Sequence, residues 1–96
     1  MKKAYWVVAY RTVPDETVLK EYGRLAGPAV QAGGGVALAR SPEVETREAG
    51  LNKRLVIIEF ESLEKAVATY ESPEYKAALQ ALGNSAERDF RIIEGI

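Results

Sequence analysis

The first block of hydrophobic residues, 4–10, contains no charged position. Aromatic and β-branched side chains dominate it, and this composition favours a strand. Successive side chains of a strand point to opposite faces, so Tyr5 and Val7 share one face and Trp6 lies on the other. Both faces are therefore apolar, and such a strand needs to be covered on both sides.

A helical repeat follows this strand. Pro14 and Asp15 are typical of a helix start, and apolar residues then recur at spacings of three and four: Val18, Tyr22, Leu25 and Ala29. The pair Gly27-Pro28 predicts a kink or an early end of this helix. The glycine run at 33–35 predicts its final stop.

Two further blocks, 36–40 and 55–60, predict strands. The second is the stronger and is apolar on both faces apart from Glu59. Between them, residues 44–48 are compatible with a short extended segment inside a charged, solvent-facing loop. Glu43, Glu45 and Glu48 alternate there without the spacing of a calcium loop.

The remaining chain predicts two short helices and a last strand. Ser62 is a good N-cap for a helix that reaches Tyr70. Ser72 and Pro73 repeat the start signal for a helix that is closed by Gly83. Residues 88–94 are then predicted to form the last strand, in which Phe90, Ile92 and Ile93 are apolar.

The order strand, helix, strand, strand, helix pair, strand is the split β-α-β pattern. We therefore predict an α+β domain of ferredoxin-like βαββαβ type, with a four-stranded antiparallel sheet and helices on one face. The chain has no linker or low-complexity segment, so residues 1–96 form a single domain.

Helices on one face leave the other face of this sheet uncovered. Each large apolar side chain left in water forgoes roughly 1.5–3 kcal/mol of burial. A second copy of the sheet, packed through a two-fold axis, is the simplest cover, and we predict a homodimer. The alternative is that the chain ends or the 41–53 loop fold over the bare face.

The amino-acid composition excludes the most common catalytic and metal-binding groups. The chain has neither cysteine nor histidine, so thiolate chemistry, the usual zinc centre and a histidine general base are excluded, and we expect no metal and no cofactor. Thirteen basic and fourteen acidic residues are interspersed, which disfavours nucleic acid as a partner. No apolar run approaches the roughly 20 residues of a membrane span, and we expect a cytoplasmic protein without a membrane partner.

Four stretches, 4–8, 56–62, 70–75 and 93–95, carry a family resemblance. In order and spacing they resemble the bacterial family called domain of unknown function 1330, within the dimeric α/β-barrel superfamily. The resemblance implies a homodimer whose two sheets face each other in a barrel. It implies no reaction, since relatives in the superfamily include cofactor-free oxygenases, lactone isomerases and haem-dependent enzymes, and a shared fold does not fix function.

Six residues are candidates for a ligand site, and each has a structural alternative. Glu59 and Arg40, on neighbouring strands, could form a functional pair or only a structural ion pair. The tyrosine candidates, which could line a cleft or only pack in the core, are Tyr22, Tyr70 and Tyr75. Trp6, together with Tyr10, could stack on a flat ligand, but we favour both as anchors of the dimer interface.

Three functions remain open at this point. The first is a homodimer that binds a small apolar or aromatic molecule in the barrel or in the helix–sheet cleft. The second is a cofactor-free enzyme, oxygenase-like or isomerase-like, that uses Arg40, Glu59 and a tyrosine. The third is a purely structural dimer. A cavity of a few hundred cubic ångströms near Glu59 would favour the first two over the third.

Overall fold

The computed structural model describes residues 2–96, which form four strands and three helices. In chain order these elements are β1 (Ala4–Thr12), α1 (Glu16–Ala32), β2 (Val36–Ser41), β3 (Leu55–Phe60), α2 (Leu63–Glu71), α3 (Pro73–Leu82) and β4 (Glu87–Glu94).

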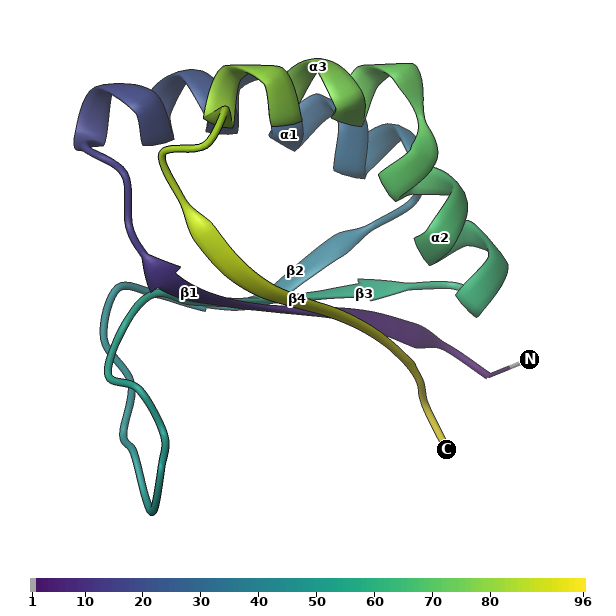
Figure 1. Ribbon diagram of the computed structural model, residues 1–96. Helices are drawn as coiled ribbons and strands as arrows, with labels where there is room; N and C mark the ends of the chain where they lie inside the picture. Colours follow the sequence, from purple (N-terminus) through teal and green to yellow (C-terminus); the bar gives the residue numbers. More distant parts are fainter. Residues whose placement is uncertain (1) are drawn as a thin grey trace.

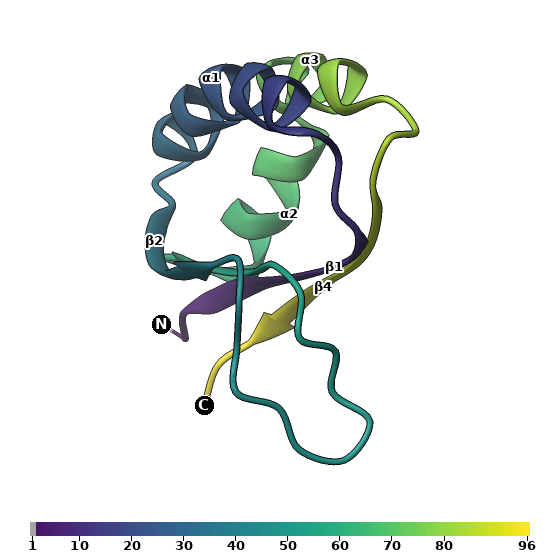
Figure 2. The same ribbon diagram turned by 90° about the vertical axis from the view of Figure 1, so that its left-hand side faces the viewer.

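The strands form one antiparallel sheet in the order β2-β3-β1-β4. All three helices lie on one face of it, with α1 and α3 side by side (Figures 1 and 2). The two chain ends lie close together, because the Gly95 N–H donates to the carbonyl of Lys3 at 2.7 Å. This arrangement confirms the predicted ferredoxin-like α+β fold.

Helix α1 runs through the proline that was expected to disturb it. Asp15 caps its start, where the carboxylate accepts the Val18 N–H at 3.0 Å. The predicted early end at residue 27 is wrong, because the helix continues to Ala32. Pro28 removes one backbone hydrogen bond, while the burial of Ala26 and Ala29 on either side holds the helix against the core. None of the helices within residues 2–96 has the length and apolar character needed to cross a bilayer.

Ser72 joins α2 to α3. Its hydroxyl donates to the Thr69 carbonyl at 2.7 Å and accepts the Tyr75 N–H at 3.2 Å. It therefore closes one helix and caps the next, as the Ser-Pro pair predicts. The same joint sets the direction of α3, which brings Tyr75 over the sheet.

The connection between β2 and β3 is a loop on the side of the sheet opposite the helices (Figures 1 and 2). The Val44 N–H donates to the side-chain oxygen of Asn52 at 2.9 Å across this loop. Residues 44–48 form no strand, so the extended segment proposed there is wrong. The charged side chains of this segment are exposed, and Glu45 forms an ion pair with Arg47 of the same loop at 3.4 Å.

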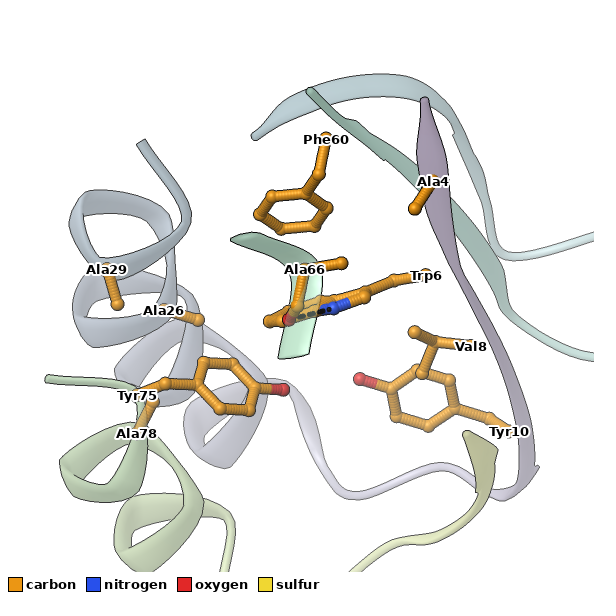
Figure 3. Close-up of a cluster of buried hydrophobic side chains, with 10 residues drawn as sticks. All are labelled: Ala4, Trp6, Val8, Tyr10, Ala26, Ala29, Phe60, Ala66, Tyr75 and Ala78. Carbon is orange, nitrogen blue, oxygen red and sulfur yellow. Dashed lines mark hydrogen bonds between the residues drawn. The ribbon is translucent and has the colours of Figure 1, made fainter. Parts of the chain in front are cut away.

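An aromatic core lies between the helices and the sheet (Figure 3). Trp6, Phe60 and Tyr75 are its largest fully buried side chains. The Trp6 ring centroid lies 4.9 Å from that of Phe60 and 5.0 Å from that of Tyr75. The Trp6 indole N–H donates to the carbonyl of Ala66 in α2 at 2.9 Å, so the one polar atom of this side chain is satisfied.

The opposite face of the sheet carries a second apolar surface. Tyr5, Val7 and Ile57 lie half-buried on this outer face, and Ile93, which pairs with Tyr5, is 58% exposed. Trp6 and Tyr10 point the other way, into the helix-covered core, with 0% and 3% exposure. The interpretation of Trp6 and Tyr10 as interface anchors is therefore wrong, and the bare face belongs to Tyr5 and Val7.

Candidate functional site

A cavity of about 410 Å³ lies between α1 and the inner face of the sheet. Its floor comes from β1, β2 and β3 and its roof from α1. Its main lining side chains are Trp6, Val8, Leu19, Tyr22, Val30, Arg40, Arg54, Ile58 and Arg88. The cavity shares its inner wall with the aromatic core, so a ligand there would contact rigid side chains.

One end of the cavity is cationic because of the strand register. Tyr10 on β1 pairs with Arg88 on β4, and its N–H donates to the Arg54 carbonyl at 3.0 Å. The Tyr10 ring therefore lies between two arginines in a row across the sheet. The guanidinium carbons of Arg54 and Arg88 lie 5.9 Å and 5.5 Å from its centroid, within cation–π range.

A β-bulge adds a third arginine. Ala37 pairs with Ile58, but the register shifts by one residue between Ala37 and Ala39, so Arg40 pairs with Val56. Without this shift Arg40 would pair with Leu55 and lie on the outer face. The bulge turns Arg40 to the inner face, where it lines the cavity.

The same register separates Arg40 from Glu59. Glu59 pairs with Tyr5 and faces outward, where it accepts a hydrogen bond from the Lys3 ammonium at 3.1 Å. The predicted Arg40–Glu59 pair is therefore wrong within the chain. The cavity that was expected near Glu59 lies on the opposite side of the sheet.

A hydrogen-bonded network holds Arg88 in place. The Tyr22 and Tyr75 hydroxyls lie 2.6 Å apart, and the Arg88 guanidinium donates to them at 3.2 Å and 3.4 Å respectively. Burial raises the pKa of Tyr75 well above its ordinary value, with a further contribution from Tyr22. Burial acts to lower the pKa of Arg88, but the two hydroxyls act to raise it and prevail. Near neutral pH the Tyr75 hydroxyl is therefore protonated and the Arg88 guanidinium is charged.

Arg40 and Arg54 differ from Arg88 in their partners. Among residues 2–96, neither side chain forms a hydrogen bond or an ion pair. The Nε of Arg54 is buried and has no hydrogen-bond partner there. A buried donor left in this state is costly, and its presence calls for an explanation.

The other end of the cavity is apolar. Trp6, Ile58 and Ala37 form one row of the floor there, and Val30 of α1 also lines the cavity. No aspartate or glutamate lines the cavity within the part of the chain that the structure describes. The cavity therefore has one cationic and one apolar end. No group of acidic side chains in residues 2–96 is arranged to hold a metal ion.

The six candidate residues are distributed unevenly around this cavity. Trp6, Tyr22 and Arg40 line it, and Tyr75 reaches its edge through the Tyr22 hydroxyl. Tyr70 packs in the aromatic core, with its ring centroid 5.0 Å from that of Phe90, and does not line the cavity. Glu59 lies outside it.

Two lining arginines, Arg54 and Arg88, were not among the candidates. A signal for Arg88 exists in the sequence, because it alternates with Phe90 and Ile92 and so shares their inner face. Arg54 directly precedes β3 and lies two positions before Val56, so the alternation of the strand would place it on the same inner face. This signal is weaker because Arg54 lies outside the strand.

Comparison with known proteins identifies the family. A sequence profile described as domain of unknown function (DUF1330) matches residues 3–96. The chain belongs to the DUF1330 family. No curated protein matches this DUF1330 chain.

Solved structures resemble this DUF1330 domain in fold. A protein of unknown function from Rhodopseudomonas palustris has 16% identity and a TM-score of 0.74, over 99% of this chain and 83% of that one. A protein from Bacteroides fragilis, described as dimeric with a ferredoxin-like fold, has 17% identity and a TM-score of 0.64, over 97% and 96%. SnoaB, a cofactor-independent oxygenase from Streptomyces nogalater, has 8% identity and a TM-score of 0.64, over 100% and 95%. At these identities the likeness concerns the fold alone.

Proposed function

We propose that the protein is a homodimer that binds a small molecule with an apolar or aromatic body in the cavity between α1 and the sheet. The observation that carries this proposal is the cavity itself. Its volume of about 410 Å³ falls within the usual range of about 300–1,000 Å³ for small-molecule sites. A mostly apolar lining with a few polar groups at one end is typical of such sites.

The purely structural alternative is less well supported. A domain without a ligand is expected to fill its interior with its own side chains. Here the wall between α1 and β2 contains Gly23, Gly27, Gly35 and Ala37, which leave space open. Neither Gly23 nor Gly27 has any heavy atom within 4 Å of the position that a Cβ would take.

The enzymatic alternative finds no support in its predicted form. Arg40 and Glu59 lie on opposite faces of the sheet, so the two residues and a tyrosine do not meet in one protomer. An oxygenase related to SnoaB in fold would have to work with the arginines and tyrosines of the cavity instead. Likeness of fold does not supply that reaction, and binding remains the proposed function.

The test uses Trp6, the only tryptophan of the chain, which lines the cavity. We expect its indole N–H signal in a proton–nitrogen NMR correlation to shift saturably with at least one of four ligands: naphthoate, naphthamide, decanoate or decanamide. Ala37→Phe, which places a ring on the inner face, should abolish the shift. Ala77→Phe, at an exposed position of α3, is the control and should not. Binding that persists in Ala37→Phe, or no binding of any ligand, would contradict the proposal.

The homodimer is supported by the outer face of the sheet. Ile57 and Val7 pair at its centre and are only half-buried in one protomer. A second copy of the chain would bring the same apolar face and could cover this one. The protein of similar fold from Bacteroides fragilis is described as dimeric. Light scattering should give twice the protomer mass of 10.5 kDa. Ile57→Lys should give the monomer, whereas Val67→Lys, on the exposed side of α2, should leave the dimer intact. A wild-type mass of one protomer would remove this part of the proposal.

A further inference from the structure

The cavity carries an excess of positive charge that the fold does not use. The whole chain has a formal net charge of −1, yet three arginines and no acidic residue among positions 2–96 line this one space. Arg40 is exposed, but the Nε of Arg54 is buried without a hydrogen-bond partner in residues 2–96, and burying a polar group in this way is costly. Arginines gathered in this way are typical of a site that binds an anion.

Two of the three arginines have no side-chain hydrogen-bond partner within residues 2–96. The guanidinium of Arg88 already donates to Tyr22 and Tyr75, which fixes it as a wall of the cavity. Arg40 and Arg54 make no side-chain hydrogen bond within the described residues, and the Arg54 Nε is buried as well. A carboxylate is the natural partner, because its two oxygens accept two parallel N–H bonds from one guanidinium.

The two ends of the cavity are arranged along the sheet. Arg54 lies beside Tyr10 at one end of the inner face, and Arg40 lies in the next row, opposite Val56. Trp6 and Ile58 follow one row further along, where the cavity is apolar. A bound molecule would therefore place its charge near the arginines and its hydrocarbon body over the tryptophan.

We propose that the cavity selects an amphipathic organic anion, a carboxylic acid with an aromatic or aliphatic body, whose carboxylate binds Arg40 and Arg54 while its body packs on Trp6 and Ile58. This inference rests on the proposed ligand-binding function and adds the chemical class of the ligand. It also accounts for the unpartnered Nε of Arg54, which a carboxylate oxygen would satisfy.

The test compares each acid with its own amide, which has nearly the same shape and no charge. Calorimetry near neutral pH should show naphthoate or decanoate binding more tightly than naphthamide or decanamide. Loss of a hydrogen bond to a charged group corresponds to roughly a tenfold to a hundredfold change in Kd. We expect a difference of that size between acid and amide. Whether naphthoate or decanoate binds better distinguishes an aromatic from an aliphatic body.

Three variants locate the carboxylate. Arg54→Met and Arg40→Met keep most of the apolar length, and each should weaken acid binding by roughly tenfold to a hundredfold and amide binding by much less. Arg47→Met removes the same charge from the exposed loop and is the control, which should bind like wild type. The Trp6 indole signal reports whether each variant is folded. Should Arg54→Met fail to fold, Arg54→Lys gives the second measurement. It keeps a positive charge but cannot donate two parallel hydrogen bonds, and it should weaken acid binding more than amide binding.

The outcomes separate the two proposals. Equal binding of acid and amide, or acid binding that neither arginine substitution weakens, would overturn the anion inference and leave the small-molecule function standing. No saturable binding of any of the four compounds would overturn both.

Discussion

Tyr75→Phe removes only the hydroxyl oxygen of a fully buried side chain on α3. The ring that packs against Trp6 is kept. The lost hydroxyl lies 2.6 Å from that of Tyr22 and 3.4 Å from a nitrogen of Arg88. The first contact is a short neutral hydrogen bond, worth about 1 kcal/mol net, and the second is long and adds less. Arg88 keeps its bond to Tyr22, so we expect a loss of about 1–2 kcal/mol in the free energy of unfolding.

The assay is urea unfolding followed by Trp6 fluorescence, at one fixed protein concentration, so that any self-association would affect all variants equally. Tyr70→Phe is the matched control, since within residues 2–96 the Tyr70 hydroxyl makes no hydrogen bond. It should change stability by less than about 0.5 kcal/mol. The double variant with Tyr22→Phe should lose about 1 kcal/mol less than the sum of the singles, because both remove the same bond. Strict additivity, or a Tyr75→Phe variant as stable as the control, would refute this account of the network.

The same hydroxyl determines a pH dependence. Burial raises the pKa of Tyr75 in the folded protein above the value of 10.0 that a free tyrosine has. The folded state therefore holds its proton more tightly than the unfolded state does. This contribution is fully present below about pH 10 and is lost as the pH rises through the folded-state value. Wild type should lose stability above about pH 10 more steeply than Tyr75→Phe, and equal slopes would contradict the assignment.

Two glycine substitutions are expected to change the free energy of unfolding in opposite directions. In Gly35→Ala the new Cβ would lie 2.6 Å from a Val30 methyl and 2.9 Å from the Phe60 ring, so we expect a destabilisation of about 1–3 kcal/mol. In Gly23→Ala the Cβ meets nothing within 4 Å inside α1, so the gain in helix propensity should stabilise by about 0.5–1 kcal/mol. Thermal unfolding measures both, and a shift of the same sign for the two would show that the space around one of them is misjudged.

Local patterns predicted most of the fold. The start signals at Asp15, Ser62 and Ser72 lie where the helices begin, because an N-cap depends only on a few adjacent residues. The alternation of Phe90 and Ile92 marks a strand for the same reason. Pro28 shows the limit of local information, since burial of its neighbours outweighed its tendency to break the helix.

Which face of each strand lies in the core was decided by packing, not by the sequence pattern. Tyr5 and Trp6 are both large and apolar, so the period of two defines two faces of β1 without saying which one the helices cover. Only the crossing of α1 and α3 over the sheet decides that Trp6 lies in the core and Tyr5 on the outer face. For that reason the sequence predicts a dimer but not the residues that form its interface.

What the sequence by itself determined is the order of elements, the ferredoxin-like topology, the absence of cysteine and histidine chemistry, and the family. The tertiary structure decided the site. Arg40 lies on β2, Arg54 directly before β3 and Arg88 on β4, and they meet because the register of the sheet aligns them. One extra residue near Leu38 turned Arg40 away from Glu59 and into the cavity. A shift of one position reverses a strand's faces, and no local pattern in this chain specifies where that shift falls.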